Sequence, residues 1–144
     1  MEVLVVLTII ILVAGFSLFV SLDSYRGNSF RSERDTAIAV LQKARSQAMS
    51  NICFGTCTDG KAHGVHFTST QYIIFQGNSF TAGDATNQVI PINNSVTFSP
   101  APPFDIIFNQ LDGTVTAPVS FTISDPANHS AQININAEGR IDNP

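Results

Sequence analysis

Cysteine and histidine residues gather in one short segment of this 144-residue chain. Cys53 and Cys57 frame the sequence CFGTC, and His63 and His66 follow shortly after. Two cysteines at this spacing can close a small disulfide loop in an exported protein, act as a redox pair, or join histidines around a metal ion. His63 and His66 face opposite sides of the strand that their segment predicts, which disfavours a shared metal ion. We therefore expect a structural disulfide between Cys53 and Cys57, with a redox or metal role and free thiols as the alternatives.

The other residues that could do chemistry lack the spacing that catalysis requires. Serine, histidine and acidic residues are scattered over segments with the composition of loops and turns. No nucleophile lies beside a base, and no glycine-rich segment joins a strand to a helix. The acids also lack the D-x-D-x-D spacing of a calcium loop. We therefore expect a protein that is not an enzyme and holds no cofactor or metal, with a membrane-anchored enzyme as the alternative.

Charge is divided unevenly along the chain and argues against a nucleic-acid partner. Residues 51–144 carry Lys61 and Arg140 against seven acidic residues, which leaves a net charge of −5. A body with this charge repels a phosphate backbone.

The N-terminal segment is an apolar run, Val3 to Leu22, with the carboxylate of Glu2 at its head. At ~1.5 Å per residue a helix of this length matches the ~30 Å hydrocarbon core of a membrane. No Lys or Arg precedes the run and no A-x-A pattern follows it, so we expect a retained anchor rather than a removable signal peptide. A lone carboxylate in hydrocarbon costs ~2.5 kcal/mol or more, so Glu2 requires a partner.

The helical pattern continues beyond the apolar run. Apolar residues recur at three- and four-residue spacing and form one stripe, with Glu33 placed to meet a neighbouring basic residue on the surface. The sequence predicts three parts: residues 1–27 as the apolar half of one long helix, 28–52 as its amphipathic half, and 53–144 as a body. The stripe consists of Ala37, Leu41, Ala44, Ala48 and Ile52.

From residue 62 onward the apolar period changes from 3.6 to 2, which is typical of strands. Asp112-Gly113 and the segment DPANH supply turn chemistry between them. We expect an α+β protein whose helix packs on an antiparallel sandwich or on two small antiparallel sheets. The predicted strands are 62–67, 71–76, 88–92, 95–98, 104–109, 113–117, 119–124 and 130–136. The predicted core consists of Val65, Phe67, Ile73, Phe75, Val96, Phe98, Ile106, Phe108, Phe121, Ile123, Ile133 and Ile135.

The segments MEVLVVLTIIIL and LQKARSQAMSN resemble the helix of a type IV pilin or type II secretion pseudopilin, most closely a minor pilin of the GspH/FimT type. The resemblance implies a structural subunit that packs with copies of itself or with other pilins. It also implies an assembly platform, a prepilin peptidase and N-terminal methylation. The implied location is the inner membrane, as a single-pass protein, and then an extracellular or periplasmic filament.

In that family the glutamate of one subunit meets the N-terminal ammonium of its neighbour, so the resemblance assigns Glu2 to register in the filament. Met1 falls where the fourth residue of the processed chain would lie, so we expect a leader, its glycine and three further residues ahead of it. The alternative is that Glu2 lies in the headgroup zone beside a free amine.

FimT-like minor pilins bind DNA through a closing Gly-Arg pair, which Gly139-Arg140 matches. Ile141 and Asp142 follow this pair, at positions where DNA binding would require further basic residues. A single arginine attracts phosphate only weakly. We therefore expect DNA to be an unfavoured partner. A body that acts as a surface adhesin or in DNA uptake is the alternative to a structural subunit.

Overall fold

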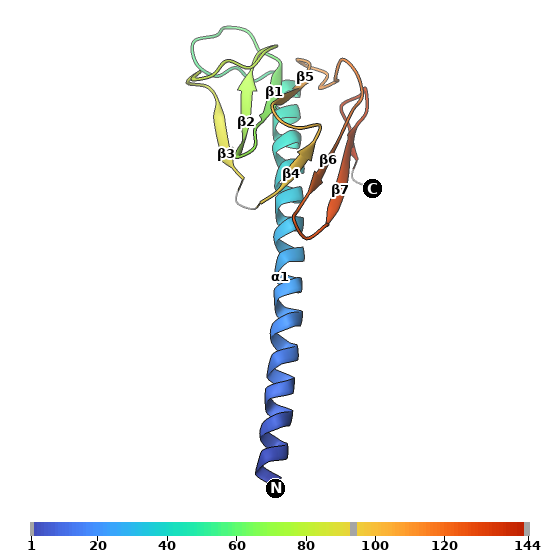
Figure 1. The fold of residues 1–144 in the computed structure, drawn as a ribbon. Helices are drawn as coiled ribbons and strands as arrows, with labels where there is room; N and C mark the ends of the chain where they lie inside the picture. The colour runs from blue at the N-terminus through green and yellow to red at the C-terminus, as the bar shows by residue number, and fades with distance from the viewer. Residues whose placement is uncertain (1, 93–94, 143–144) are drawn as a thin grey trace.

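The computed structural model describes residues 2–92 and 95–142, and for residues 16–26 it describes the backbone alone. One helix, α1 (Glu2–Met49), runs for 48 residues and carries the body on its C-terminal half (Figure 1). This confirms the prediction of one long helix in front of a body. The predicted end at residue 52 was wrong, because the helix ends three residues earlier.

The end of α1 has a specific hydrogen-bonded cap. Asn51 adopts a left-handed φ of 54°. Its amide donates to the carbonyl of Ala48 at 3.1 Å, and the amide of Ile52 donates to the carbonyl of Gln47 at 3.1 Å. These two bonds form a Schellman cap with asparagine where glycine is common, and they turn the chain away from the helix axis. Ile52 therefore leaves the stripe to which the apolar spacing assigned it.

Within the described residues, eight strands form two four-stranded antiparallel sheets. The first sheet has the order β3-β2-β1-β5 and the second β4-β6-β7-β8. The helix contacts β1, β2 and β5 of the first sheet and β8 of the second. The strands are β1 (His63–Phe67), β2 (Gln71–Gln76), β3 (Gln88–Pro91), β4 (Thr97–Ser99), β5 (Phe104–Phe108), β6 (Val119–Ser124), β7 (Ser130–Ile135) and β8 (Ile141–Asp142).

One predicted strand, residues 113–117, was wrong, although the turn before it is present. Asp112 accepts hydrogen bonds from the amide and hydroxyl of Thr114, both at 2.9 Å. The amide of Val115 donates to the carbonyl of Ala137 at 3.1 Å rather than back to β5. The segment therefore continues as a loop that closes over the body, and the second sheet gains β8 instead.

The two sheets share one core with the amphipathic half of the helix. Leu41 and the alanines of the predicted stripe are fully buried, which lets the helix lie close to the first sheet. Phe67 on β1 stacks on Phe104 at 4.6 Å between ring centroids. It also meets Phe121 of the second sheet edge-on at 5.2 Å, so one aromatic ring joins both sheets.

The predicted core is confirmed for every residue except Val96, which is half-buried. Ile73 and Phe75 are buried on the outer face of the first sheet, away from the helix. Phe80, from the loop after β2, covers this outer face and lies edge-on to Phe75 at 5.7 Å. Tyr72 and Ile74, which alternate with them on the inner face, are buried core residues that the sequence prediction omitted.

Candidate functional site

The first turns of α1 form an apolar surface that none of the described residues outside the helix covers. Every large apolar side chain from Val3 to Val13 is exposed, with relative exposures of 50–73%. The one hydroxyl in this stretch, Thr8, donates to the carbonyls of Leu4 at 2.6 Å and Val5 at 3.0 Å. Its polarity is therefore satisfied within the helix, and the surface stays apolar. The exposed side chains are Val3, Leu4, Val5, Val6, Leu7, Ile9, Ile10, Ile11, Leu12 and Val13.

Glu2 lies at the N-terminal end of this apolar surface. It is exposed and belongs to the first turn of α1, where free backbone amides and the helix dipole favour a negative charge. Among the described residues, none pairs with its carboxylate. Met1, which the resemblance aligns with the residue before the glutamate, lies outside the described residues. The carboxylate is therefore exposed to solvent at the head of the apolar surface.

Across the part of the chain that the structure describes, no helix carries a stretch both long and apolar enough to cross a membrane. The predicted span from Val3 to Leu22 stays a prediction, and the side chains of residues 16–22 within it lie outside those described.

Cys53 and Cys57 lie together in the loop between the helix and β1. Their sulfur atoms are at bonding distance and their Cα atoms are 6.1 Å apart, a separation that a disulfide spans without backbone movement. The loop between them is held to β2 by Gln76. The carboxamide of Gln76 accepts from the amide of Phe54 at 2.6 Å and donates to the carbonyl of Phe54 at 3.3 Å. The geometry suits the structural bridge, which stays a prediction.

The two histidines of β1 face opposite sides of the sheet, as their spacing indicates. His63 is 1% exposed on the inner face, where burial lowers its pKa even though its ring bonds the Lys61 carbonyl at 3.1 Å. His66 lies on the outer face, stacked on Phe80 at 3.9 Å and paired with Asp105 of β5 at 2.5 Å. Each histidine therefore has its own structural contact, and within the described residues no group of three or more metal-binding side chains forms.

Glu33 lies in a different place from the surface position that its sequence predicted. It is 2% exposed and lies beneath the body, not on the surface. The hydroxyl of Tyr72 donates to its carboxylate at 3.1 Å. Burial, together with the charge of Glu33, raises the pKa of Tyr72 far above its ordinary value. The signal in the sequence was an acid in phase with the apolar stripe, next to Ala37 on the same helix face.

The Gly-Arg pair near the C-terminus has a structural explanation. Gly139 adopts a φ of 72°, and a Cβ atom there would collide with the carbonyl of Gly113. Arg140 is exposed and pairs with Asp142 at 2.9 Å. A cleft of about 340 Å3 lies beside it and is also lined by Arg45. Arg45 donates to the carbonyls of Gly113 and Glu138, so it joins the helix to the loops of the body.

Comparison with known proteins gives a match at the level of structure. No protein-family model matches the chain, and no curated protein sequence matches it. The fold is similar to the crystal structure of the type IV minor pilin FimU of Pseudomonas aeruginosa, with a TM-score of 0.57 and 18% sequence identity. The match covers 79% of this chain and 91% of that chain. A long N-terminal helix packed on two antiparallel sheets is thus the fold that this chain shares with a type IV pilin.

Proposed function

We propose that this chain is a structural subunit of a pilin-like filament, in which the exposed apolar half of α1 packs against the same half of neighbouring subunits. The observation that carries the proposal is the uncovered apolar surface from Val3 to Val13. The similarity of the fold to a type IV minor pilin supports it.

The energetics of that surface favour assembly. Removing a Val, Leu or Ile side chain from water contributes about 1.5–3 kcal/mol. Several such side chains on one helix therefore supply a large driving force once neighbouring helices cover them. The same side chains are compatible with lipid, so the proposed sequence of states is an inner-membrane protein first and a filament subunit afterwards.

Glu2 makes the proposed packing selective for register. Its carboxylate is costly to bury without a positive partner, and the N-terminal ammonium of a neighbouring subunit is such a partner. A neighbour displaced along the filament axis would leave both charges unpaired. Register is therefore fixed by a single charge pair among many non-directional apolar contacts.

The finer assignment follows the resemblance of the helix to the GspH/FimT type. We propose a minor pilin or a pseudopilin of a type II secretion system, with other pilins, an inner-membrane assembly platform and a prepilin peptidase as its partners. The filament is extracellular for a pilus and periplasmic for a secretion system. N-terminal methylation after processing belongs to the same proposal.

The alternative is a FimT-like subunit that binds DNA through Gly139 and Arg140, or a surface adhesin. The ion pair between Arg140 and Asp142 weakens the attraction of this arginine for phosphate. Retention of the purified protein on DNA-cellulose at about 150 mM salt, lost on Arg140→Ala, would favour this alternative over a purely structural subunit.

The proposal is tested by replacing Glu2 with alanine in a host that makes the filament, with the complete amino end and the sister subunits present. Membrane insertion should not decrease, because removing a carboxylate lowers the cost of placing the helix in hydrocarbon. The amount of the chain in sheared surface fibres, measured by immunoblot, should fall at least tenfold.

Asp35→Ala is the matched control, because Asp35 is another exposed acid on the same helix. Its incorporation should equal that of the unmodified chain. Normal incorporation of the Glu2→Ala variant into fibres would show that Glu2 does not set the register between subunits. If the unmodified protein is found only in the membrane and never in fibres, the filament proposal itself is wrong.

A further inference from the structure

The C-terminal end of α1 lies far from Glu2 (Figure 1). A polar cleft of about 660 Å3 lies beside the segment that leads from this end of the helix into β1. Three chain segments meet around it: residues 59–62 before β1, 76–78 at the end of β2, and 109–110 after β5. They come together because β1 runs antiparallel to both neighbours, so that its start lies beside their ends. The cleft lies within the 300–1,000 Å3 range of small-molecule sites.

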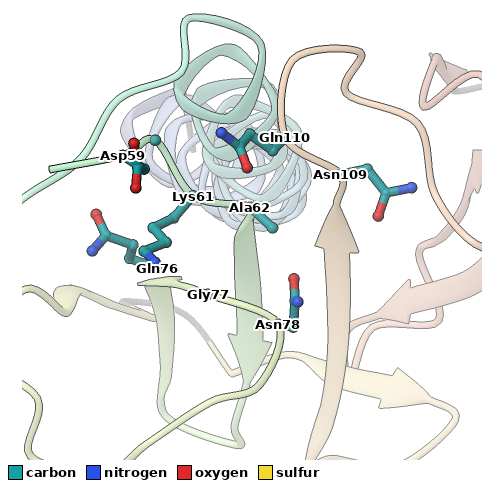
Figure 2. A pocket seen from close by; sticks show the side chains of 9 residues that line it. Asp59, Lys61, Ala62, Gln76, Gly77, Asn78, Asn109 and Gln110 are labelled. Atoms are coloured by element: carbon teal, nitrogen blue, oxygen red, sulfur yellow. The ribbon is translucent and has the colours of Figure 1, made fainter. Parts of the chain in front are cut away.

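Amide side chains dominate the lining of the cleft. Asn78 reaches up from the loop after β2, while Gln110 and Lys61 extend from the other two segments (Figure 2). Asp59 lies at the rim, and Ala62 contributes the one apolar side chain of the lining. Among the described residues that line the cleft, none is aromatic.

Some of the side chains that line the cleft have hydrogen-bond donors and acceptors without a partner among the described residues. The side-chain nitrogen Nε2 of Gln110 donates to Oδ1 of Asn51 at 2.5 Å. The carboxamide oxygen of Gln110 is left available as an acceptor. Within the described part of the chain, the Asn78 carboxamide and the Lys61 ammonium have no protein partner. The cleft thus offers a cationic donor, an amide that both donates and accepts, and an amide acceptor.

The rim of the cleft is held in place by structure outside it. The Gln76 side chain bonds both backbone groups of Phe54, which lies between Cys53 and Cys57. The amide of Gly77 donates to the carbonyl of Ala62 at 2.7 Å and joins two of the three segments. A preformed rim lowers the entropy cost of ordering side chains around a ligand.

We propose that this cleft binds a neutral oligosaccharide. Sugar hydroxyls both donate and accept hydrogen bonds, which matches the mixed amide lining. One lysine and one aspartate give no net charge, so the cleft does not select for a strongly charged ligand. An apolar peptide side chain finds no apolar pocket here. This binding is independent of the proposed filament function, because it uses the opposite end of the molecule.

The expected affinity is modest. Without an aromatic ring, the site lacks the stacking surface that adds apolar contact to sugar recognition. We expect a Kd on the order of 1 mM for a trisaccharide.

The test is a nuclear magnetic resonance titration of the full chain, labelled with nitrogen-15, in a zwitterionic detergent that contains no sugar. Maltotriose and triacetylchitotriose are the neutral probes, and a sulfated heparin disaccharide is the anionic probe. A neutral probe should cause saturable amide shifts confined to residues 59–62, 76–78 and 109–110. Asn78→Ala combined with Gln110→Ala should weaken the binding at least tenfold.

Gln132→Ala is the matched control, because Gln132 is an exposed amide on β7, far along the chain from the cleft. It should leave the titration unchanged. Shifts caused by the sulfated probe alone and lost on Lys61→Met would overturn the proposal in favour of an anion site. Shifts at the cleft that grow with protein concentration without sugar would overturn it in favour of contact between copies. No shift at about 50 mM of either neutral probe would also overturn it.

Discussion

The two halves of α1 are both rich in apolar residues, yet they bury them in different ways. In the half that carries the body, Leu41, Ala44 and Ala48 are fully buried against the first sheet. In the first turns, Leu4 and Leu12 are 69% and 64% exposed. The buried half presents a narrow stripe with small residues, which suits one flat partner. The free half is apolar on all sides, which suits a surrounding of lipid or of several helices.

The acids of the two halves repeat this contrast. Glu33 lies in the buried half and has Tyr72 of its own chain as a hydrogen-bond donor. Glu2 lies in the free half, and none of the described residues pairs with it. An acid on an apolar helix face requires a partner wherever that face is buried. The buried half therefore finds its partners within the chain, whereas we propose that neighbouring subunits supply the partners of the free half.

The largest expected effect separates the two halves directly. Leu41→Ala should lower the free energy of unfolding of the body by about 2–5 kcal/mol, because it opens a cavity between helix and sheet. Leu4→Ala should leave this free energy unchanged within about 0.5 kcal/mol. Urea unfolding of both variants in the same detergent measures the difference. Equal effects would show that the free half is covered within the single chain.

A smaller effect is expected for the buried acid. Tyr72→Phe removes the hydroxyl that donates to Glu33 while it keeps the ring in the core. Hydrogen bonds to charged groups contribute about 1.5–3 kcal/mol, so the free energy of unfolding at pH 7 should fall by about that amount. Tyr25 lies outside the described side chains, so the second tyrosine of the chain is not a suitable control. An unchanged free energy of unfolding for Tyr72→Phe would show that the hydrogen bond to Glu33 does not stabilise the buried half.

His63, on the inner face of β1, should make the stability of the body depend on pH. Burial lowers the pKa of His63, so the folded chain holds this ring neutral below the ordinary value near 6.5, where the unfolded chain takes up a proton. The free energy of unfolding should therefore fall as the pH drops from 7 toward 5. His63→Phe should show a smaller fall between these two pH values, measured by urea unfolding. An identical fall in both proteins would exclude this residue as the cause.

The smallest effect is expected on the outer side of the helix. Arg34 and Asp35 form an ion pair of 2.9 Å whose side chains are 28% and 64% exposed. Such pairs contribute about 0–1 kcal/mol and weaken in salt. Asp35→Ala should change the midpoint of thermal unfolding by no more than a few degrees at low salt and by less at high salt. A larger change would mean that this side of the helix also contacts the body.

Local patterns predicted the elements of the fold well. The change of apolar period near residue 62 separates helix from strands, and the turn at Asp112-Gly113 lies where its residue types place it. The core residues from Val65 to Ile135 follow from strand alternation, apart from Val96. These features depend on neighbours close in sequence, so the sequence is sufficient for them.

Other features depend on contacts between distant segments. Residues 113–117 have strand-like alternation, but the bond from Val115 to Ala137 holds them as a loop. Glu33 is in phase with the apolar stripe, but the group that it meets, Tyr72 on β2, follows only from the path of the chain. The amide cleft is assembled from three segments separated by many residues, and no single segment carries its pattern.

By itself the sequence determined that a long apolar helix precedes an antiparallel body, because the periods of 3.6 and 2 are local properties of the backbone. Only the tertiary structure decided which strands cover the amphipathic half of the helix, which acid is buried, and where the strand ends meet to form a cleft. The physical reason is that an apolar or polar residue type specifies that a partner is required, whereas the partner's identity follows from the path of the whole chain.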